Sequence, residues 1–130
     1  MVRKKLLEMA KKARENAYAP YSNFKVGAAI ITEDGKIFTG ANVENASYGL
    51  SICAERVALF KAVSEGYRKF KAIAVVADTD GPVSPCGACR QVLSEFGDMD
   101  VIMANVKGDM KVMKLSELLP ESFTPEDLRR

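Results

Sequence analysis

The chain has 130 residues, of which 48% are hydrophobic and 28% are charged, a size that predicts one domain over residues 1–130. Its 19 basic and 17 acidic residues give a net charge of +2, so electrostatics offer no argument for a nucleic-acid partner. The N-terminus has no apolar run after its basic residues, and no segment is long enough to span a membrane. Three thiols without a secretory signal fit a reducing compartment, so we expect a cytoplasmic protein without a membrane partner.

The N-terminal part of the chain is predicted to form a helix followed by a hairpin. Residues 2–18 have the apolar spacing of an amphipathic helix. Its apolar stripe consists of Leu6, Ala10, Ala13 and Ala17. Two strands follow, over residues 24–32 and 37–43, and the tight turn at 33–36 makes them antiparallel.

The middle of the chain is strongly apolar. Residues 51–65 are predicted to form a helix that is apolar nearly all round, so we expect it to pack on the sheet on one side and on a neighbouring subunit on another. Residues 71–77 form an uninterrupted apolar run, which is typical of a central strand covered on both faces.

The C-terminal part completes an alternating order of strands and helices. The remaining elements are a turn-rich loop at 78–85, a helix at 86–96, strands at 101–106 and 110–113, and a short helix at 115–119. The turn between the last two strands is too short for a crossover, so these strands must be antiparallel. The order predicts an α/β fold in which a five-stranded mixed sheet lies between helices, as three α/β/α layers.

All three cysteines lie in two short segments, and the chain contains no histidine. Cys86 and Cys89 form a Cys-x-x-Cys pair at the predicted start of one helix, and Cys53 lies near the start of another. A Cys-x-x-Cys pair alone also fits a thioredoxin-like redox site. Three thiolates are instead typical of a catalytic zinc with one open position, since structural zinc sites usually have four ligands. Glu55 could stand beside that position without binding the metal, like the proton-shuttling glutamate of zinc deaminases.

Five segments of the chain together match the pattern of a known family: Ala19-Pro20-Tyr21-Ser22, Phe24-Lys25-Val26-Gly27-Ala28-Ala29, Asn42-Val43-Glu44-Asn45-Ala46, Cys53-Ala54-Glu55-Arg56 and Pro85-Cys86-Gly87-Ala88-Cys89-Arg90-Gln91. With these segments, the chain resembles the cytidine deaminases of the small, homotetrameric, three-cysteine class from about residue 17 to residue 128. Val57 departs from the family, which often has threonine there, and we expect only a packing consequence. The resemblance implies hydrolytic deamination of cytidine, and of deoxycytidine, to the uridine nucleoside and ammonia in pyrimidine salvage, with one Zn²⁺ per subunit.

The resemblance also implies roles for individual residues. Glu55 would be the catalytic acid and base, which moves a proton from the attacking water to N3 of the pyrimidine and then to the leaving ammonia. Phe24 would pack on the pyrimidine ring, where strand alternation alone would make it a core aromatic. Asn42 and Glu44 would bind ribose hydroxyls, and the backbone of Ala54 would bind the amide edge of the base.

Other residues are expected to act around this site. Ala46, Tyr48 and Phe123 resemble positions that complete a neighbour's pocket in the homotetramer, although each also fits ordinary packing. Three thiolates on Zn²⁺ leave a charge of −1, and Arg56 follows the catalytic glutamate, so it can donate hydrogen bonds to cysteine sulfurs. Arg90 follows the last ligand and could act in the same way.

Two other functions remain open at this point. Blasticidin-type deaminases have a similar size and cysteine count, although Phe24 and the Asn42 and Glu44 pair favour a nucleoside. A non-catalytic zinc module that binds nucleic acid or a protein is also possible. Glu55 and the nearly balanced charge argue against it.

Overall fold

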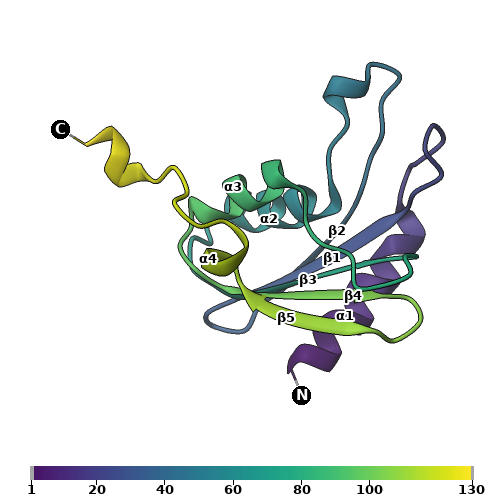
Figure 1. The fold of residues 1–130 in the computed structure, drawn as a ribbon, viewed down its shortest axis with the longest axis horizontal. Coiled ribbons are helices and arrows are strands. Elements are labelled where there is room, and N and C mark those ends of the chain that lie inside the picture. Colours follow the sequence, from purple (N-terminus) through teal and green to yellow (C-terminus); the bar gives the residue numbers. More distant parts are fainter. Residues whose placement is uncertain (1, 130) are drawn as a thin grey trace.

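The computed structural model describes residues 2–129, and it shows a five-stranded mixed sheet covered by helices on both faces (Figure 1). The strands are β1 (Val26–Thr32), β2 (Ile37–Ala41), β3 (Phe70–Ala77), β4 (Asp100–Asn105) and β5 (Met110–Lys114). The helices are α1 (Val2–Ala13), α2 (Ala54–Ser64), α3 (Gly87–Ser94) and α4 (Leu115–Leu118), with 3-10 turns η1 (Arg14–Asn16), η2 (Tyr48–Leu50) and η3 (Pro125–Leu128). The predicted fold class is confirmed.

The strands lie in the order β2-β1-β3-β4-β5. Both hairpins, β1 with β2 and β4 with β5, are antiparallel as predicted. β1 is also antiparallel to β3, whereas β3 and β4 are parallel and are joined through α3. β2 ends two residues earlier than predicted, at Ala41, and Val43 makes only isolated bridges to Tyr18 and Ile52.

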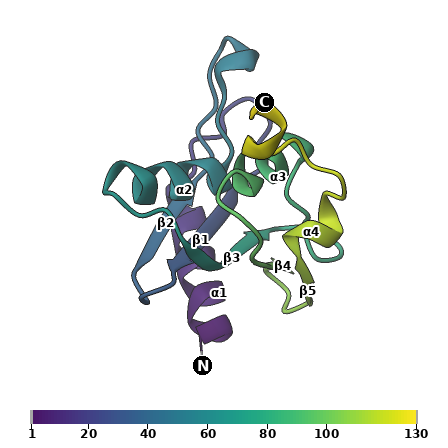
Figure 2. The ribbon, with the colours of Figure 1, turned by 90° about the vertical axis from the view of Figure 1, so that its left-hand side faces the viewer.

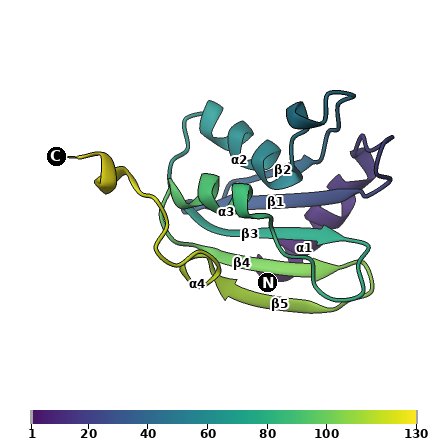
Figure 3. The same ribbon diagram turned by 45° about the horizontal axis from the view of Figure 1, so that its top comes forward.

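Alternation along the strands builds a separate core on each face of the sheet. In β1, Ala28 and Ile30 belong to the cluster under α2 and α3, whereas Ala29 and Ile31 belong to the cluster under α1. Figure 3 looks onto the face that carries α2 and α3, with α1 behind the sheet, and Figure 2 shows the same layers from the side.

Two glycines set how closely the helices approach the sheet. A Cβ added to Gly27 would lie 2.0 Å from the carbonyl oxygen of Ala10 in α1. A Cβ added to Gly40 would lie 2.6 Å from the carbonyl oxygen of Ala54 and from the nitrogen of Ala58 in α2. The close contact at Gly40 fixes the first turn of α2 against β2.

Two helices, α2 and α3, begin later than the sequence predicts, and the difference matters for the site. Cys53 and Cys86 have extended backbones, with ψ of 153° and 166°, so α2 begins at Ala54 and α3 at Gly87. The N-terminal helix also ends early, at Ala13, and continues only as the turn η1.

Several apolar side chains project from this single chain. Phe60 on the outer side of α2 is 46% exposed, and Tyr48 and Leu50 in η2 are 74% and 72% exposed. The segment after α4 also runs away from the sheet (Figure 1). Among residues 2–129, no helix combines the length and apolar character that a membrane crossing requires.

Candidate metal centre and active site

The three cysteine sulfurs come together at the starts of α2 and α3. Cys53 immediately precedes α2, Cys86 immediately precedes α3, and Cys89 lies in the first turn of α3. Their sulfurs all lie within 4.8 Å of one another, with 3.9 Å between Cys53 and Cys86 and 3.5 Å between Cys86 and Cys89. Free N–H groups and the positive end of a helix dipole stabilise thiolates at such positions.

Charge around the sulfurs also suits a bound cation. Arg56 Nη2 donates to Cys53 Sγ at 3.4 Å, and Arg56 Nε is buried without an acceptor among residues 2–129. The pKa of Cys53 falls to about 5, chiefly because of the neighbouring Cys89 thiol and also because Arg56 donates to its sulfur. The pKa of Cys89 rises for the reciprocal reason, aided by burial. Three sulfur donors, one readily ionised, fit zinc, and a set of three protein ligands is typical of a catalytic zinc.

Glu55, the second residue of α2, lies beside these sulfurs and is only 4% exposed. Its pKa rises to about 7, mainly because burial disfavours the carboxylate, and the negative charge of Cys53 adds to the effect. A carboxyl group with that pKa can both accept and release a proton near neutral pH, as a general acid–base group must.

A cavity of about 230 Å³ opens in front of Glu55 and the metal ligands. The candidate site residues that line it are Phe24, Asn42, Glu44, Cys53, Ala54, Glu55 and Cys86. The cavity is completed by Val26, Ser51, Ile52, Val75, Val83 and Ser84, which sequence reasoning did not single out. A larger cavity of about 390 Å³ lies between α1 and the β4–β5 turn, but it contains none of the cysteines, so the chemistry favours the smaller one.

Comparison with known proteins agrees with this geometry. Residues 1–105 match the family described as the cytidine and deoxycytidylate deaminase zinc-binding region. The chain belongs to the cytidine deaminase family. It is 60% identical to the cytidine deaminase of Sporosarcina psychrophila over 126 residues, which cover 95% of this chain and 93% of that one. The crystal structure of cytidine deaminase from Burkholderia pseudomallei matches with a TM-score of 0.92 and 59% identity, covering 95% of this chain and all (100%) of that one.

A more distant relative bears on the alternative substrate. The blasticidin-S deaminase of Bacillus cereus is 31% identical over 128 residues, which cover 91% of each chain. This chain is thus a zinc-binding deaminase with much greater similarity to the cytidine deaminases. The match also makes a thioredoxin-like redox site or a non-catalytic zinc module the poorer interpretation of its cysteines.

The two cavity residues predicted to bind ribose, Asn42 and Glu44, are already held by the protein. Asn42 Nδ2 donates to the Phe24 carbonyl at 2.8 Å, and Asn42 Oδ1 accepts from the Val26 N–H at 2.8 Å. These contacts leave the amide one hydrogen and one lone pair for a ligand. Glu44 accepts from the Ser22 hydroxyl and from the N–H groups of Tyr21 and Ser22, at 3.0 and 3.1 Å. The Ser22 hydroxyl is the main reason that the pKa of Glu44 is lowered.

The two apolar residues that the sequence singled out for this cavity differ in their exposure. Phe24 is 43% exposed just before β1, so it is not the core aromatic that strand alternation alone would make it. Ala54 is fully buried as the first residue of α2, where the backbone N–H groups have no acceptor within the helix.

Besides Cys89 and Arg56, which lie at the metal centre, four of the residues singled out from the sequence do not line the cavity. Ala46 is exposed, Tyr48 packs its ring 5.9 Å from that of Tyr21, and Phe123 is 56% exposed in the C-terminal segment. Arg90 makes none of its hydrogen bonds with a sulfur in the described chain. It donates to the carbonyls of Pro85 and Leu118, at 2.9 and 2.8 Å, and to the Ser84 hydroxyl at 2.5 Å, so it ties the loop before Cys86 to α4.

Proposed function

We propose that this chain hydrolyses the bond between C4 and the amino group of cytidine, and of deoxycytidine, to give the uridine nucleoside and ammonia. It would act as a single catalytic domain in pyrimidine salvage. The observation that carries the proposal is the buried Glu55 carboxyl, with its pKa near 7, beside three converging sulfurs at the base of a cavity. The cytidine deaminases at 58–60% identity support the choice of substrate.

The residues of the chain divide the work of this reaction. Zinc, when bound by Cys53, Cys86 and Cys89, supplies a Lewis acid that makes water nucleophilic near neutral pH. Glu55 takes a proton from the water that adds to C4 and gives it to N3 of the pyrimidine. Glu55 then takes the remaining proton from the hydroxyl now on C4 and gives it to the amino nitrogen, so the C4–N bond breaks, ammonia leaves and C4 keeps the oxygen as a carbonyl. Arg56 holds one thiolate and offsets part of its charge.

The cavity walls suggest how a nucleoside would lie. We assign the Phe24 ring to contact with the pyrimidine and the free N–H of Ala54 to its amide edge. The spare hydrogen and lone pair of Asn42, together with the ionised Glu44, would bind the ribose diol. Because neighbouring backbone groups already fix both polar side chains, they would bind the sugar without losing further side-chain freedom.

We further propose a homotetramer that completes each pocket, in a reducing cytoplasm where the thiols stay free. The exposed aromatic rings of Phe60, Tyr48 and Phe123 support this assembly, since isolated subunits seldom leave so much apolar surface on projecting segments. Ala46, Tyr48 and Phe123 lie outside the cavity of their own chain, so they are available to a neighbouring one. Sedimentation equilibrium that finds an active monomer at micromolar concentration would contradict the tetramer.

The activity can be tested with the purified protein. It should contain one zinc per chain and lower the ultraviolet absorbance of cytidine, and a panel of deoxycytidine, cytidine nucleotides, blasticidin S and single-stranded DNA would define its range. Glu55→Gln should retain zinc but lose activity by roughly 10²–10⁴-fold, the usual contribution of general acid–base catalysis. Turnover of cytidine by this variant near the wild-type rate would remove Glu55 from the mechanism.

A further inference from the structure

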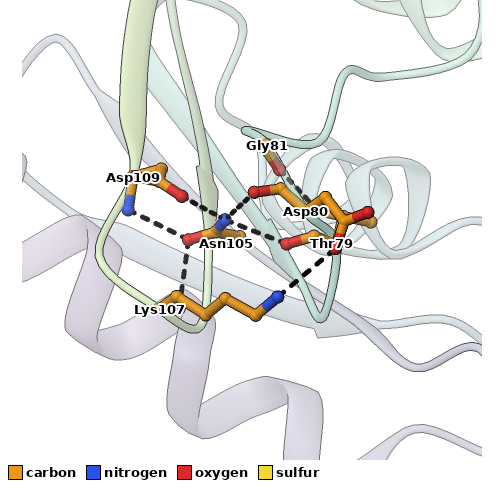
Figure 4. A network of polar contacts seen from close by, with 6 residues as sticks. All are labelled: Thr79, Asp80, Gly81, Asn105, Lys107 and Asp109. Atoms are coloured by element: carbon orange, nitrogen blue, oxygen red, sulfur yellow. Dashed lines mark hydrogen bonds and ion pairs between the residues drawn. The ribbon is translucent and has the colours of Figure 1, made fainter.

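A polar network centred on Asn105 lies outside the metal centre (Figure 4). This side chain, at the end of β4, is only 4% exposed. Its Oδ1 accepts from the backbone N–H groups of Lys107 and Asp109, at 3.0 and 2.9 Å, which closes the β4–β5 turn. Its Nδ2 donates to the carbonyls of Thr79 and Asp80, at 2.9 and 3.1 Å, and to the Asp109 carboxylate at 2.7 Å. One amide therefore joins the β4–β5 turn to the loop that follows β3.

That loop, residues 78–85, leads directly into the candidate active site. It ends at the metal ligand Cys86, and two of its residues, Val83 and Ser84, line the 230 Å³ cavity. The Val83 N–H donates to the Ala104 carbonyl at 3.4 Å, so the loop passes over the end of β4 on its way to the site. A shift of this loop would move one cavity wall and one zinc ligand together.

Side chains hold the loop at both ends. Arg90 binds the far end through Pro85 and Ser84, as described above. Within residues 2–129, Asn105 is the buried side chain that holds the near end. The ion pair between Lys107 and Asp80, at 3.4 Å, is exposed and so contributes little to the position of the loop.

We propose that Asn105 is a positioning residue of the active site, which acts by holding the carbonyls of Thr79 and Asp80 so that the loop presents Val83 and Cys86 correctly. Without these donors, the two carbonyls would turn to water and the loop would sample other paths. Metal and substrate would then bind to a site that is correctly arranged only part of the time, which weakens both interactions. The kinetic part of this proposal rests on the proposed function, whereas the loop and metal parts do not.

A pair of variants separates the loop contact from the turn contact. Asn105→Asp keeps an oxygen for the two N–H groups of the turn but loses the donors to the loop, and it sets a carboxylate against Asp109. The double variant Asn105→Asp/Asp109→Asn removes this repulsion, because the new amide at position 109 can donate to the new carboxylate at position 105. The turn is then restored, and the carbonyls of Thr79 and Asp80 still lack their donor. Lys107→Ala is the control, since it removes only the exposed ion pair and keeps its backbone N–H.

Three measurements on the zinc-loaded protein test the idea: amide hydrogen exchange in segment 78–86, transfer of zinc to a chromogenic chelator, and KM and kcat on cytidine. One hydrogen bond is worth a factor of roughly 2–10 in an equilibrium constant, so we expect the double variant to exchange faster in this segment alone. The carbonyls of Thr79 and Asp80 share one amide hydrogen while the other goes to Asp109, so we also expect the rate of zinc transfer and KM to rise roughly 2–10-fold, with kcat less affected and the melting temperature close to that of the wild type. Lys107→Ala should match the wild type in every measurement.

Two results would overturn the proposal. A double variant with wild-type exchange in the segment, zinc transfer and KM would show that the loop does not depend on Asn105. A double variant that unfolds as a whole, or exchanges faster throughout the sheet, would make Asn105 a residue of the fold and not of the site. If the wild-type protein itself failed to deaminate cytidine, the proposed function would fall, and exchange and zinc transfer would still decide the role of Asn105.

Discussion

Replacing Glu55 by glutamine should stabilise the metal-free protein, and increasingly so as the pH rises. Glu55 is 4% exposed, and the pKa of its carboxyl group is raised from 4.5 to about 7, mainly by burial. Glutamine has nearly the same shape and cannot ionise. The variant therefore removes the cost of a buried charge while leaving the packing of α2 in place.

The size and sign of the effect follow from the two pKa values. Below pH 4.5 the carboxyl is protonated in both the folded and the unfolded chain, so its neutral form stabilises the fold fully. As the pH rises toward 7, the unfolded chain releases this proton first, and the free energy of unfolding falls by about 1.4 kcal/mol per pH unit. Between pH 5 and pH 8 the wild type should lose roughly 2–3 kcal/mol relative to the glutamine variant.

Urea unfolding of both metal-free proteins at pH 5, 6, 7 and 8, followed by circular dichroism, would measure this difference. The cysteines titrate in both proteins, so subtracting one curve from the other largely removes their contribution. Glu8→Gln, on the exposed side of α1, is the control, because an exposed carboxylate stays solvated in both states. A constant difference between wild type and Glu55→Gln across this range would refute the argument from burial.

Three further variants test the rest of the site. Cys86→Ala should lose zinc and melt at a lower temperature, because the metal bound by the three cysteines joins the starts of α2 and α3. Full zinc content with a normal melting temperature would exclude Cys86 as a ligand. Arg56→Gln should lower turnover and shift the pH–rate profile to higher pH, because the cation beside Cys53 is lost; an unchanged profile would make it a structural arginine. Gly40→Ala should cost about 1–3 kcal/mol in unfolding free energy, since its Cβ would lie 2.6 Å from the Ala54 oxygen; normal melting would contradict that close contact.

Features that depend on local pattern could be predicted from the sequence. The apolar run at 71–77 lies in the central strand β3, and the short turn after β4 forms a hairpin as expected. The cysteines lie at helix starts because both segments follow loops at one end of the sheet. The helix limits were less accurate, since the extended backbones of Cys53 and Cys86 delay each helix to the following residue.

Contacts between distant segments could not be predicted, because no local pattern encodes them. Arg90 follows a metal ligand in sequence, yet its guanidinium reaches the Leu118 carbonyl, 28 residues away. Asn42 binds the backbone of Phe24, 18 residues away, and no local pattern predicts this contact. Asn105 opens a turn that contains glycine, so its turn contacts could have been predicted. Its bonds to the loop after β3 could not.

The wide spacing of the metal ligands has a consequence for how the chain folds. Cys53 and Cys86 are 33 residues apart. Cys53 precedes α2, which connects β2 to β3, and Cys86 precedes α3, which connects β3 to β4. The sulfurs can meet only after β3 has paired with β1, a contact between segments far apart in the chain, and such contacts close slowly. A refolding chain should therefore acquire tight zinc affinity late, after this pairing, and the Cys-x-x-Cys segment alone should compete poorly for the metal before it.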